Sequence, residues 1–258
     1  MNKFQQDLII KESTTDKISH HGYHRFYPWF LTHLRGQNVN FLEIGIDKTE
    51  SLKLWKGYFG SVNLHGLDID DKEFNDTEVT LHKIDQSNAL ELDKFVATVG
   101  IKFDVILDDG SHVPEHQILT INKLWDLVEP GGIYIIEDIE TSYWKKSEIY
   151  GYRFNAGRRG IMHEFIKLID IINSEFSKNK NQSLLVEKLS QEVEMVTFAQ
   201  NCIILVKKDY QNFNQYYNRD YRFDENINAR SILNFPNRIG SILNFPNRIV
   251  RKLRSFKK

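Results

Sequence analysis

Five apolar runs that each end in acidic residues are the feature that most constrains how this chain can fold. Helix-like stretches separate most of the runs, and strands that alternate with helices are typical of a parallel, doubly wound sheet. The runs are almost continuously apolar, as expected of strands covered on both faces. The expected strands are 39–46, 62–69, 79–84, 103–107 and 133–136, and the expected helices between them are 51–59, 87–98 and 115–128.

The remaining segments complete a three-part organisation. Residues 4–35 are expected to be mostly helical, and Pro130-Gly131-Gly132 is expected to end the helix before the fifth strand. A long helix over 160–177 precedes two strand-like runs, 192–199 and 201–207, which predict a hairpin. Five parallel strands followed by a terminal hairpin resemble the α/β sheet of class I methyltransferases. The predicted parts are an N-terminal helical cap (1–38), a methyltransferase domain (39–208) and a basic C-terminal extension (209–258).

The acidic residues all fall where a parallel sheet binds its ligands. In an open α/β sheet, ligands lie at the carboxyl ends of the strands. One or two acids there are explained by helix capping, but five in register favour a binding site. The strand-end acids are Glu43, Asp68, Asp85, the pair Asp108-Asp109 and the pair Glu137-Asp138.

Composition and charge exclude several classes of partner. The formal net charge of −1 gives no field suited to gripping nucleic acid. No run approaches the roughly 20 apolar residues that span a bilayer, and Met1 to Asp7 shows no apolar core of a secretory signal. Cys202 is the lone cysteine, so no intrachain disulfide forms. We therefore expect a cytoplasmic enzyme.

The first strand leads into a segment suited to a nucleotide-like cofactor. Residues 43–51 resemble methyltransferase motif I, written E-x-G-x-x-x-G, although Thr49 or Glu50 stands where related sequences carry the second glycine. Gly45 would let the backbone approach the methionine part of S-adenosylmethionine. Ser51 and the helix start behind it can donate hydrogen bonds to the cofactor carboxylate. The segment predicts Glu43, Gly45 and Ser51 as cofactor-binding residues.

The ends of the second and third strands extend this cofactor half. Asp68 follows Glu43 by 25 residues and can accept hydrogen bonds from both ribose hydroxyls. That logic fits NAD as well, but the chain lacks the G-x-G-x-x-G of Rossmann dehydrogenases after its first strand. Asp85 and Gln86 are predicted to contact the adenine edge, and Asp85 or Ser87 is equally suited to cap the following helix.

The fourth and fifth strand ends carry a more specific pattern. The run from Asp108 to His112, followed 26 residues later by Asp138, resembles the metal-dependent sugar O-methyltransferases of the mycinamicin and tetracenomycin-rhamnose type. Bacterial methyltransferases encoded with surface-polysaccharide clusters share the pattern. Thr15-Asp16-Lys17 and His21-Gly22-Tyr23 resemble the N-terminal signature of that group. The resemblance covers roughly residues 14–207.

The resemblance implies a role for each residue of this second half. Asp109, Glu137 and Asp138 correspond to ligands of Mg²⁺ or another divalent cation, and His112 to the general base. Asp108 contacts the amino group of the cofactor or shapes the loop. The chemistry agrees, because methylation of an alcohol gains from a base and from a cation that lowers the hydroxyl pKa. Carboxylate oxygens suit Mg²⁺.

The acceptor stays open at this stage. We expect a sugar hydroxyl in capsular-polysaccharide or natural-product biosynthesis. A phosphate-type or phosphoramidate oxygen is the alternative, and His112 would then orient an anion instead of removing a proton. Arg153, Arg158 and Arg159 lie in an expected lid over 147–159 and suit a nucleotide-linked or phosphorylated sugar, or simply solvent. The alternative interpretations from other functional classes are an NAD-dependent oxidoreductase and a non-catalytic binding module.

The C-terminal extension holds a tandem repeat. Residues 231–240 and 241–250 are identical at nine of ten positions, and from Arg230 onward there are eight basic and no acidic residues. Two units are too few for a solenoid. The expected roles are an arm that docks on another subunit of a homo-oligomer, a flexible tail, or peripheral contact with an acidic membrane face.

Overall fold

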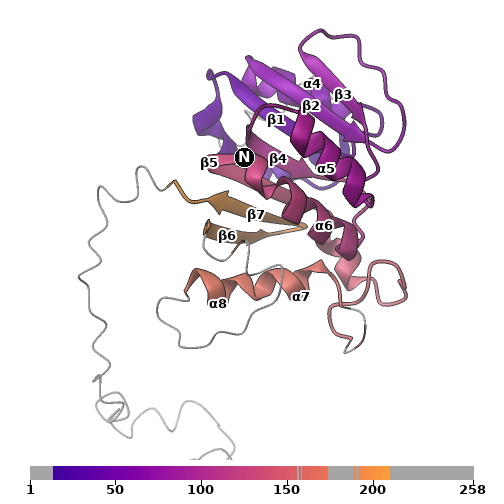
Figure 1. The fold of residues 1–258 in the computed structure, drawn as a ribbon. Coiled ribbons are helices and arrows are strands. Elements are labelled where there is room, and N and C mark those ends of the chain that lie inside the picture. The colour runs from indigo at the N-terminus through magenta and orange to yellow at the C-terminus, as the bar shows by residue number, and fades with distance from the viewer. Residues whose placement is uncertain (1–13, 156, 158, 174–188, 190–191, 210–258) are drawn as a thin grey trace, which may run out of the picture. The chain divides into compact units, whose positions relative to one another are not determined.

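Seven strands form one sheet in the part of the chain that this computed structural model describes, which is residues 14–155, 157, 159–173, 189 and 192–209 (Figure 1). The strand order is β3-β2-β1-β4-β5-β7-β6. The first five strands are parallel, and β7 is antiparallel to both β5 and β6. The predicted class I methyltransferase sheet is confirmed. Its strands are β1 Val39–Ile44, β2 Val62–Asp68, β3 Val79–Lys83, β4 Phe103–Asp108, β5 Val128–Glu137, β6 Val193–Ala199 and β7 Cys202–Lys207.

Helices cover both faces of this sheet and create two buried cores. One core is built on the helices after the third, fourth and fifth strands, namely α5 (Ala89–Thr98), α6 (Pro114–Leu124), α7 (Ile161–Ile166) and α8 (Leu168–Ile172). The other core is built on η1 (Tyr23–Arg25), α3 (Tyr27–Leu31) and α4 (Glu50–Phe59).

The alternation of side chains along the strands decides which core each strand-end acid meets. Successive residues of a strand point to opposite faces. Leu42 and Ile44 belong to the α5–α6 core, so Glu43 between them points to the α3–α4 side. Leu107 belongs to the α3–α4 core, so Asp108 points to the α5–α6 side. By the same parity Glu137 shares the face of Glu43.

The topology places the ends of β1 and β4 at the crevice of the sheet. From β1 the chain builds outward through β2 to β3, and it then crosses back to β4 and β5. The point where the strand order reverses is the place where open α/β sheets bind ligands. Ile44 pairs with Asp108 at this point, so motif I and the Asp108–His112 run are adjacent.

Three expected elements differ from the observed ones. The N-terminal segment is a series of short helices, α2 (Asp16–Ser19), η1, α3 and η2 (Thr32–Leu34), because Gly22 takes a left-handed φ of 68° that interrupts a continuous helix. Pro130-Gly131-Gly132 lies inside β5 instead of ending a helix. It forms an irregularity in the pairing with β4, and the preceding chain ends in η3 (Trp125–Leu127).

A single long helix was expected over 160–177. The described part of this segment ends at Asn173 and forms two short helices, α7 and α8. The tandem repeat and residues 210–258 of the basic extension lie outside the described residues, as does Arg158. The predicted roles of the extension therefore stay predictions.

None of the helices in the described ranges combines the length and the apolar character that crossing a bilayer requires.

Two stacked histidines on the outer strands predict a sensitivity to acid. His65 on β2 and His82 on β3 approach to 3.0 Å between Nδ1 and Nε2, with ring centroids 5.2 Å apart. Burial lowers the pKa of His65 to about 4, with His82 adding to the effect, and burial lowers the pKa of His82 as well. Below its ordinary pKa of 6.5 the unfolded imidazole gains a proton while the folded one stays neutral. Stability is therefore lost as the pH falls from about 6.5 towards about 4.

We expect the His65→Gln variant to lose less of its free energy of unfolding between pH 7 and pH 4.5 than the parent chain, by about 2–3 kcal/mol. Urea unfolding at the two pH values measures this difference. His33→Gln, at an exposed histidine, is the control and should leave the acid sensitivity as it is. Equal acid sensitivity in the parent chain and His65→Gln would contradict the assignment.

Candidate active site

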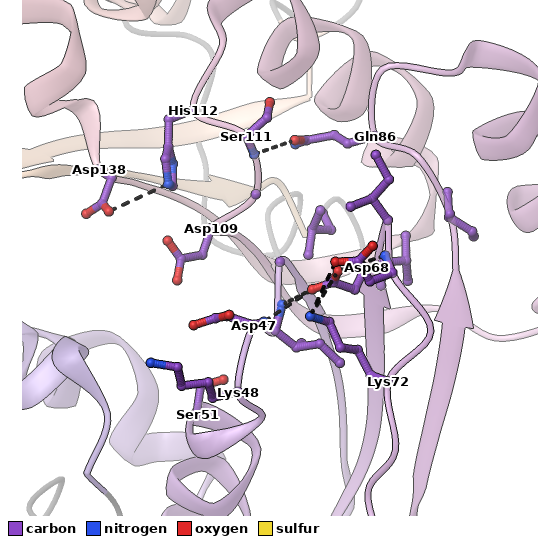
Figure 2. A pocket seen from close by; sticks show the side chains of 18 of the residues that line it. Asp47, Lys48, Ser51, Asp68, Lys72, Gln86, Asp109, Ser111, His112 and Asp138 are labelled. Carbon is purple, nitrogen blue, oxygen red and sulfur yellow. Dashed lines mark hydrogen bonds and ion pairs between the residues drawn. The ribbon is translucent and has the colours of Figure 1, made fainter.

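A cavity of about 770 Å³ lies at the carboxyl ends of β1, β2 and β4 (Figure 2). This volume is in the range of sites for drug-sized ligands and cofactors. Figure 2 shows His112, Asp138 and Asp109 on one side of the view and Asp68 with Lys72 on the other. Eight of the eleven predicted site residues line the cavity: Gly45, Ser51, Asp68, Asp85, Gln86, Asp109, His112 and Asp138.

Gly45 is required by the close approach of two loops. It has a φ of 80°, and a Cβ placed on it would lie 2.2 Å from the carbonyl oxygen of Asp109. The Gly45 N–H donates to the carbonyl of Leu67, and the Asp109 N–H donates to the carbonyl of Ile44. From the sequence, Gly45 is predicted to allow a close approach between the backbone and the cofactor. The structure adds that this glycine lets motif I touch the loop that carries Asp109.

Asp68 holds the loop that follows β1. Its Oδ2 accepts hydrogen bonds from the N–H groups of Ile46 at 3.1 Å and Asp47 at 3.2 Å, and its Oδ1 accepts from Asp70 at 3.0 Å. Lys72 Nζ lies 3.5 Å from Oδ1. The carboxylate thus lines the cavity between motif I and the end of β2, and its predicted contact with the ribose hydroxyls stays a prediction.

Gln86 connects the third strand end to the fourth. Its Nε2 donates to Asp108 Oδ1 at 2.6 Å and its Oε1 accepts from the N–H of Ser111 at 2.9 Å. Burial raises the pKa of the Asp108 carboxyl to about 6, against the lowering effect of its hydrogen bonds from Gln86 and Gly110. Asp108 is fully buried, so it supports the wall of the cavity from behind.

Asp85 lines the cavity and shapes the turn that precedes α5. Its Oδ1 accepts from the N–H and the hydroxyl of Ser87, and these hydrogen bonds lower the pKa of Asp85. The N-cap of α5 is Asn88, whose side chain accepts from Leu90 and Glu91. Neither Asp85 nor Ser87 is that cap, which corrects this part of the sequence analysis.

Asp109, His112 and Asp138 form a cluster with the donor set of a metal site. Each offers one ligand atom, and these atoms all lie within 4.8 Å of one another. His112 Nε2 lies 3.7 Å from Asp138 Oδ2. Both His112 and Asp138 have left-handed backbones, with φ values of 56° and 54°. Non-glycine residues adopt this conformation rarely, and such strain concentrates at functional sites.

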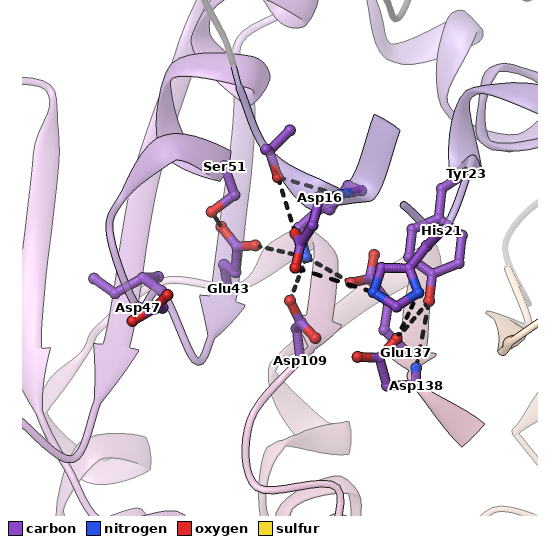
Figure 3. Close-up of polar contacts among 12 residues, drawn as sticks. Asp16, His21, Tyr23, Glu43, Asp47, Ser51, Asp109, Glu137 and Asp138 are labelled. Carbon is purple, nitrogen blue, oxygen red and sulfur yellow. Dashed lines mark hydrogen bonds and ion pairs between the residues drawn. The ribbon is translucent and has the colours of Figure 1, made fainter. Parts of the chain in front are cut away.

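Lys17 joins three acids from three different strand ends. Its Nζ lies 2.5 Å from Asp109 Oδ2, 2.5 Å from Glu137 Oε2 and 3.3 Å from Glu43 Oε1. Figure 3 shows Glu43, Asp109 and Glu137 pointing towards a common centre. The lysine side chain is only 2% exposed, so its charge is compensated by these acids and not by water. Thr15 caps the short helix α2 that carries Lys17.

Charge attraction within this cluster opposes the effect of burial on each group. Burial alone lowers the pKa of Lys17, but attraction from Asp109, Glu137 and Glu43 raises it well above its ordinary value. Burial raises the pKa of Glu137, against the opposing effect of Lys17. The other Glu137 oxygen accepts from Tyr27 at 2.5 Å. Lys17 is therefore a fixed cation beside the candidate metal site.

The structure separates three predicted residues from the cavity. Glu43, Asp108 and Glu137 are at most 1% exposed and do not line it. Glu43 accepts from Ser51 at 2.7 Å, and Asp108 accepts from Gln86. Glu43 and Asp108 thus contact residues that do face the cavity, because strand parity turns both side chains into the cores.

Four residues of the site were not predicted from the sequence: Lys17, Tyr23, Tyr27 and Asn201. Tyr23 donates to Asp138 Oδ1 at 2.9 Å, and Asn201 donates to the same oxygen at 2.8 Å. Lys17 and Tyr23 belong to the N-terminal signature that the sequence analysis quoted, so a signal was present without an assigned role. Nothing in the sequence marks Asn201.

The segment after Asp138 carries aromatic side chains at the surface. Tyr143 and Trp144 are 44% and 49% exposed. Arg153 lies over the ring of Phe154, and Arg159 contacts His163. Neither arginine is among the residues that line the described cavity, which gives no support to phosphate recognition by the expected lid.

Comparison with curated proteins finds sugar O-methyltransferases. The chain is 38% identical over 135 residues to the mycinamicin VI 2''-O-methyltransferase of Micromonospora griseorubida, covering 46% of this chain and 33% of that protein. It is 33% identical over 139 residues to the 8-demethyl-8-alpha-L-rhamnosyl tetracenomycin-C 2'-O-methyltransferase of Streptomyces olivaceus, covering 50% of this chain and 36% of that protein. No protein-family model matches the chain.

A solved structure agrees with these relatives. The MycE methyltransferase of the mycinamycin biosynthetic pathway, in complex with Mg and S-adenosylhomocysteine (SAH), is 26% identical and superposes with a TM-score of 0.68. The match covers 81% of this chain and 55% of that one. The chain spans about a third of the length of its curated relatives and about half of this structure. The predicted resemblance to metal-dependent sugar O-methyltransferases is confirmed.

Proposed function

We propose that this chain is an S-adenosylmethionine-dependent, Mg²⁺-assisted O-methyltransferase that methylates a sugar hydroxyl. The observation that carries the proposal is the convergence of Asp109, His112 and Asp138 at the edge of a cofactor-sized cavity, at the switch point of a methyltransferase sheet. A similar structure contains Mg and SAH, and the similar curated proteins are named as sugar O-methyltransferases.

Each part of the cofactor is assigned to residues at a different strand end. In this proposal the Asp68 carboxylate accepts hydrogen bonds from the ribose hydroxyls, and Asp85 with Gln86 contacts the adenine. The backbone at Gly45 and the first turn of α4 with Ser51 face the methionine part. Glu43 and Asp108 hold Ser51 and Gln86 in place from the cores.

The donor set fits a hard divalent cation. Asp109 and Asp138 present carboxylate oxygens to the cavity, and such oxygens are preferred by Mg²⁺. Glu137, the third ligand implied by the resemblance, has its two oxygens on Lys17 and Tyr27. Asp109 and Asp138 would hold the cation, which would supply Lewis-acid chemistry that lowers the pKa of the acceptor hydroxyl. Lys17 pairs with Asp109 and Glu137 and holds both carboxyl groups in place beside that position.

In this proposal His112 takes the hydroxyl proton as the general base. Its imidazole lines the cavity, and its Nε2 lies 3.7 Å from Asp138 Oδ2. A base contributes typically 10²–10⁴-fold to such reactions, as an order of magnitude. A phosphate-type acceptor is already anionic and needs no base.

We therefore expect His112→Ala to lower the rate of methyl transfer to a sugar hydroxyl by about 10²-fold or more, with SAH affinity unchanged. Transfer of labelled methyl from S-adenosylmethionine to a panel of glycosides and sugar phosphates measures this rate. Near-normal turnover of the variant would overturn the role of His112 as a base and favour the anionic acceptor.

The biosynthetic setting is argued from two sources. The relatives found among curated proteins are named for mycinamicin VI, a rhamnosyl tetracenomycin-C and demethylmacrocin, which supports a natural-product glycoside. A role in surface or capsular polysaccharide biosynthesis is supported by the motif pattern alone. Comparing transfer to a macrolide glycoside with transfer to a short capsular oligosaccharide separates the two.

An NAD-dependent oxidoreductase is the alternative of another class. The observed sheet order with β7 between β5 and β6 and the absence of G-x-G-x-x-G after β1 both disfavour it. Calorimetry with SAH and with NAD tests the choice. Micromolar binding of SAH and no binding of NAD are expected, and the reverse would sink the proposed function.

A further inference from the structure

Asp138 stands before a helix that its own side chain does not cap. It is the N-cap residue of η4 (Ile139–Tyr143), yet it makes no side-chain cap hydrogen bond. An acid at this position ordinarily accepts from the N–H groups of the first turn. The carboxylate of Asp138 is turned towards Asp109 and His112 instead. The N–H groups at the start of η4 therefore need another acceptor.

Asn201, in the turn between β6 and β7, supplies that acceptor. Its Oδ1 accepts from the N–H of Glu140 at 2.8 Å, and its backbone carbonyl accepts from the N–H of Ile139 at 3.3 Å. Asn201 has a left-handed φ of 63°, which asparagine tolerates better than most residues. The turn is held there because β7 pairs with β5, with Cys202 opposite Glu137.

The same amide group also fixes the carboxylate of Asp138. Asn201 Nδ2 donates to Asp138 Oδ1 at 2.8 Å and to His21 Nδ1 at 2.9 Å. The Tyr23 hydroxyl donates to the same Oδ1 at 2.9 Å. Figure 3 shows Tyr23 and His21 beside Asp138. Two donors on Oδ1 oppose rotation of the carboxylate, and Oδ2 is the oxygen that faces His112.

We propose that Asn201 is a positioning residue for the metal site, which caps η4 in place of Asp138 and aims Asp138 Oδ2 at the cation. The inference rests on the proposed function, because it takes Asp109 and Asp138 as cation ligands. It explains why a turn outside the first five strands carries an asparagine that uses both ends of its amide. Loss of such an outer-shell partner typically weakens metal binding 10–100-fold.

The test compares Mn²⁺ binding by the full chain and by Asn201→Gly. Mn²⁺ accepts the same oxygen ligands as Mg²⁺ and is counted directly by electron paramagnetic resonance. Glycine keeps the left-handed turn and the backbone carbonyl, and it removes the side-chain amide together with Cβ. We expect about a tenfold or greater loss of Mn²⁺ affinity, with SAH affinity measured without metal staying within about twofold, since Asn201 does not line the cavity.

Two further variants make the result specific. Gln200→Ala alters the exposed neighbour in the same turn and should bind Mn²⁺ like the parent chain. Tyr23→Phe removes the second donor to Asp138 Oδ1 and should weaken Mn²⁺ binding even if Asn201→Gly fails to fold. Parent-like Mn²⁺ affinity in Asn201→Gly, or equal losses of Mn²⁺ and SAH binding, would overturn the positioning role. If the parent chain binds SAH but no Mn²⁺, the metal proposal and this inference both fall.

Discussion

Asp138→Asn is expected to weaken Mn²⁺ binding by about two orders of magnitude or more, since losing an outer-shell partner alone typically costs 10–100-fold. The asparagine oxygen can still accept from Tyr23 and Asn201, which hold that side of the residue. Its amino group then takes the place of Oδ2 and turns two hydrogens towards the cation. Electron paramagnetic resonance of Mn²⁺ with the full chain measures the change.

The matched control is Asp93→Asn, the same exchange at an exposed acid of α5 whose carboxylate pairs with Lys123. It should leave Mn²⁺ binding as in the parent chain. Losing even an outer-shell partner typically weakens metal binding 10–100-fold. If Asp138→Asn bound Mn²⁺ with an affinity within about threefold of the parent chain, Asp138 would therefore not be a ligand.

Lys17→Met is expected to lower the free energy of unfolding by about 3–5 kcal/mol, the usual penalty for removing one partner of a buried ion pair. Methionine fills a similar volume with an unbranched chain, so packing changes little. What is lost is the cation within 3.3 Å of Glu43, Asp109 and Glu137. These acids would then repel one another in a site with little access to water. Urea unfolding with and without the substitution measures the loss.

Lys53→Met is the control for this prediction. Lys53 pairs with Glu50 on the surface of α4, where its side chain is 46% exposed. Exposed pairs contribute about 0–1 kcal/mol, so this variant should unfold close to the parent chain. Equal effects of the two substitutions would show that Lys17 is not the counter-charge of the acid cluster.

The sheet and its binding edge were predictable because local patterns determine them. Apolar runs separated by helical segments set the strands, and the strand-end acids Asp68, Asp109 and Asp138 come to one rim because parallel strands share their carboxyl ends. Strand parity is also present in the sequence. It turns Glu43 and Asp108 to opposite faces, which explains why these acids support cavity residues from the cores.

The remaining parts of the site depend on contacts between distant residues. Lys17 lies 120 positions from Glu137, and Asn201 lies 63 positions from Asp138. No local pattern reports such pairs, because the residues meet only after the N-terminal segment and the hairpin have packed on the sheet. The prediction that Pro130-Gly131-Gly132 ends a helix was wrong for a related reason. Pro-Gly-Gly ordinarily ends an element, but β5 pairs with β4 on both sides of it, at Val128 and again from Ile133 onward.

The most direct test of the proposed function is a crystal structure of the full chain soaked with SAH and Mn²⁺, with the metal located by anomalous scattering. The account predicts SAH in the cavity with its ribose at Asp68, and one Mn²⁺ bound by the carboxylates of Asp109 and Asp138 next to His112. SAH bound elsewhere, or an Mn²⁺ peak that touches neither Asp109 nor Asp138, would contradict it.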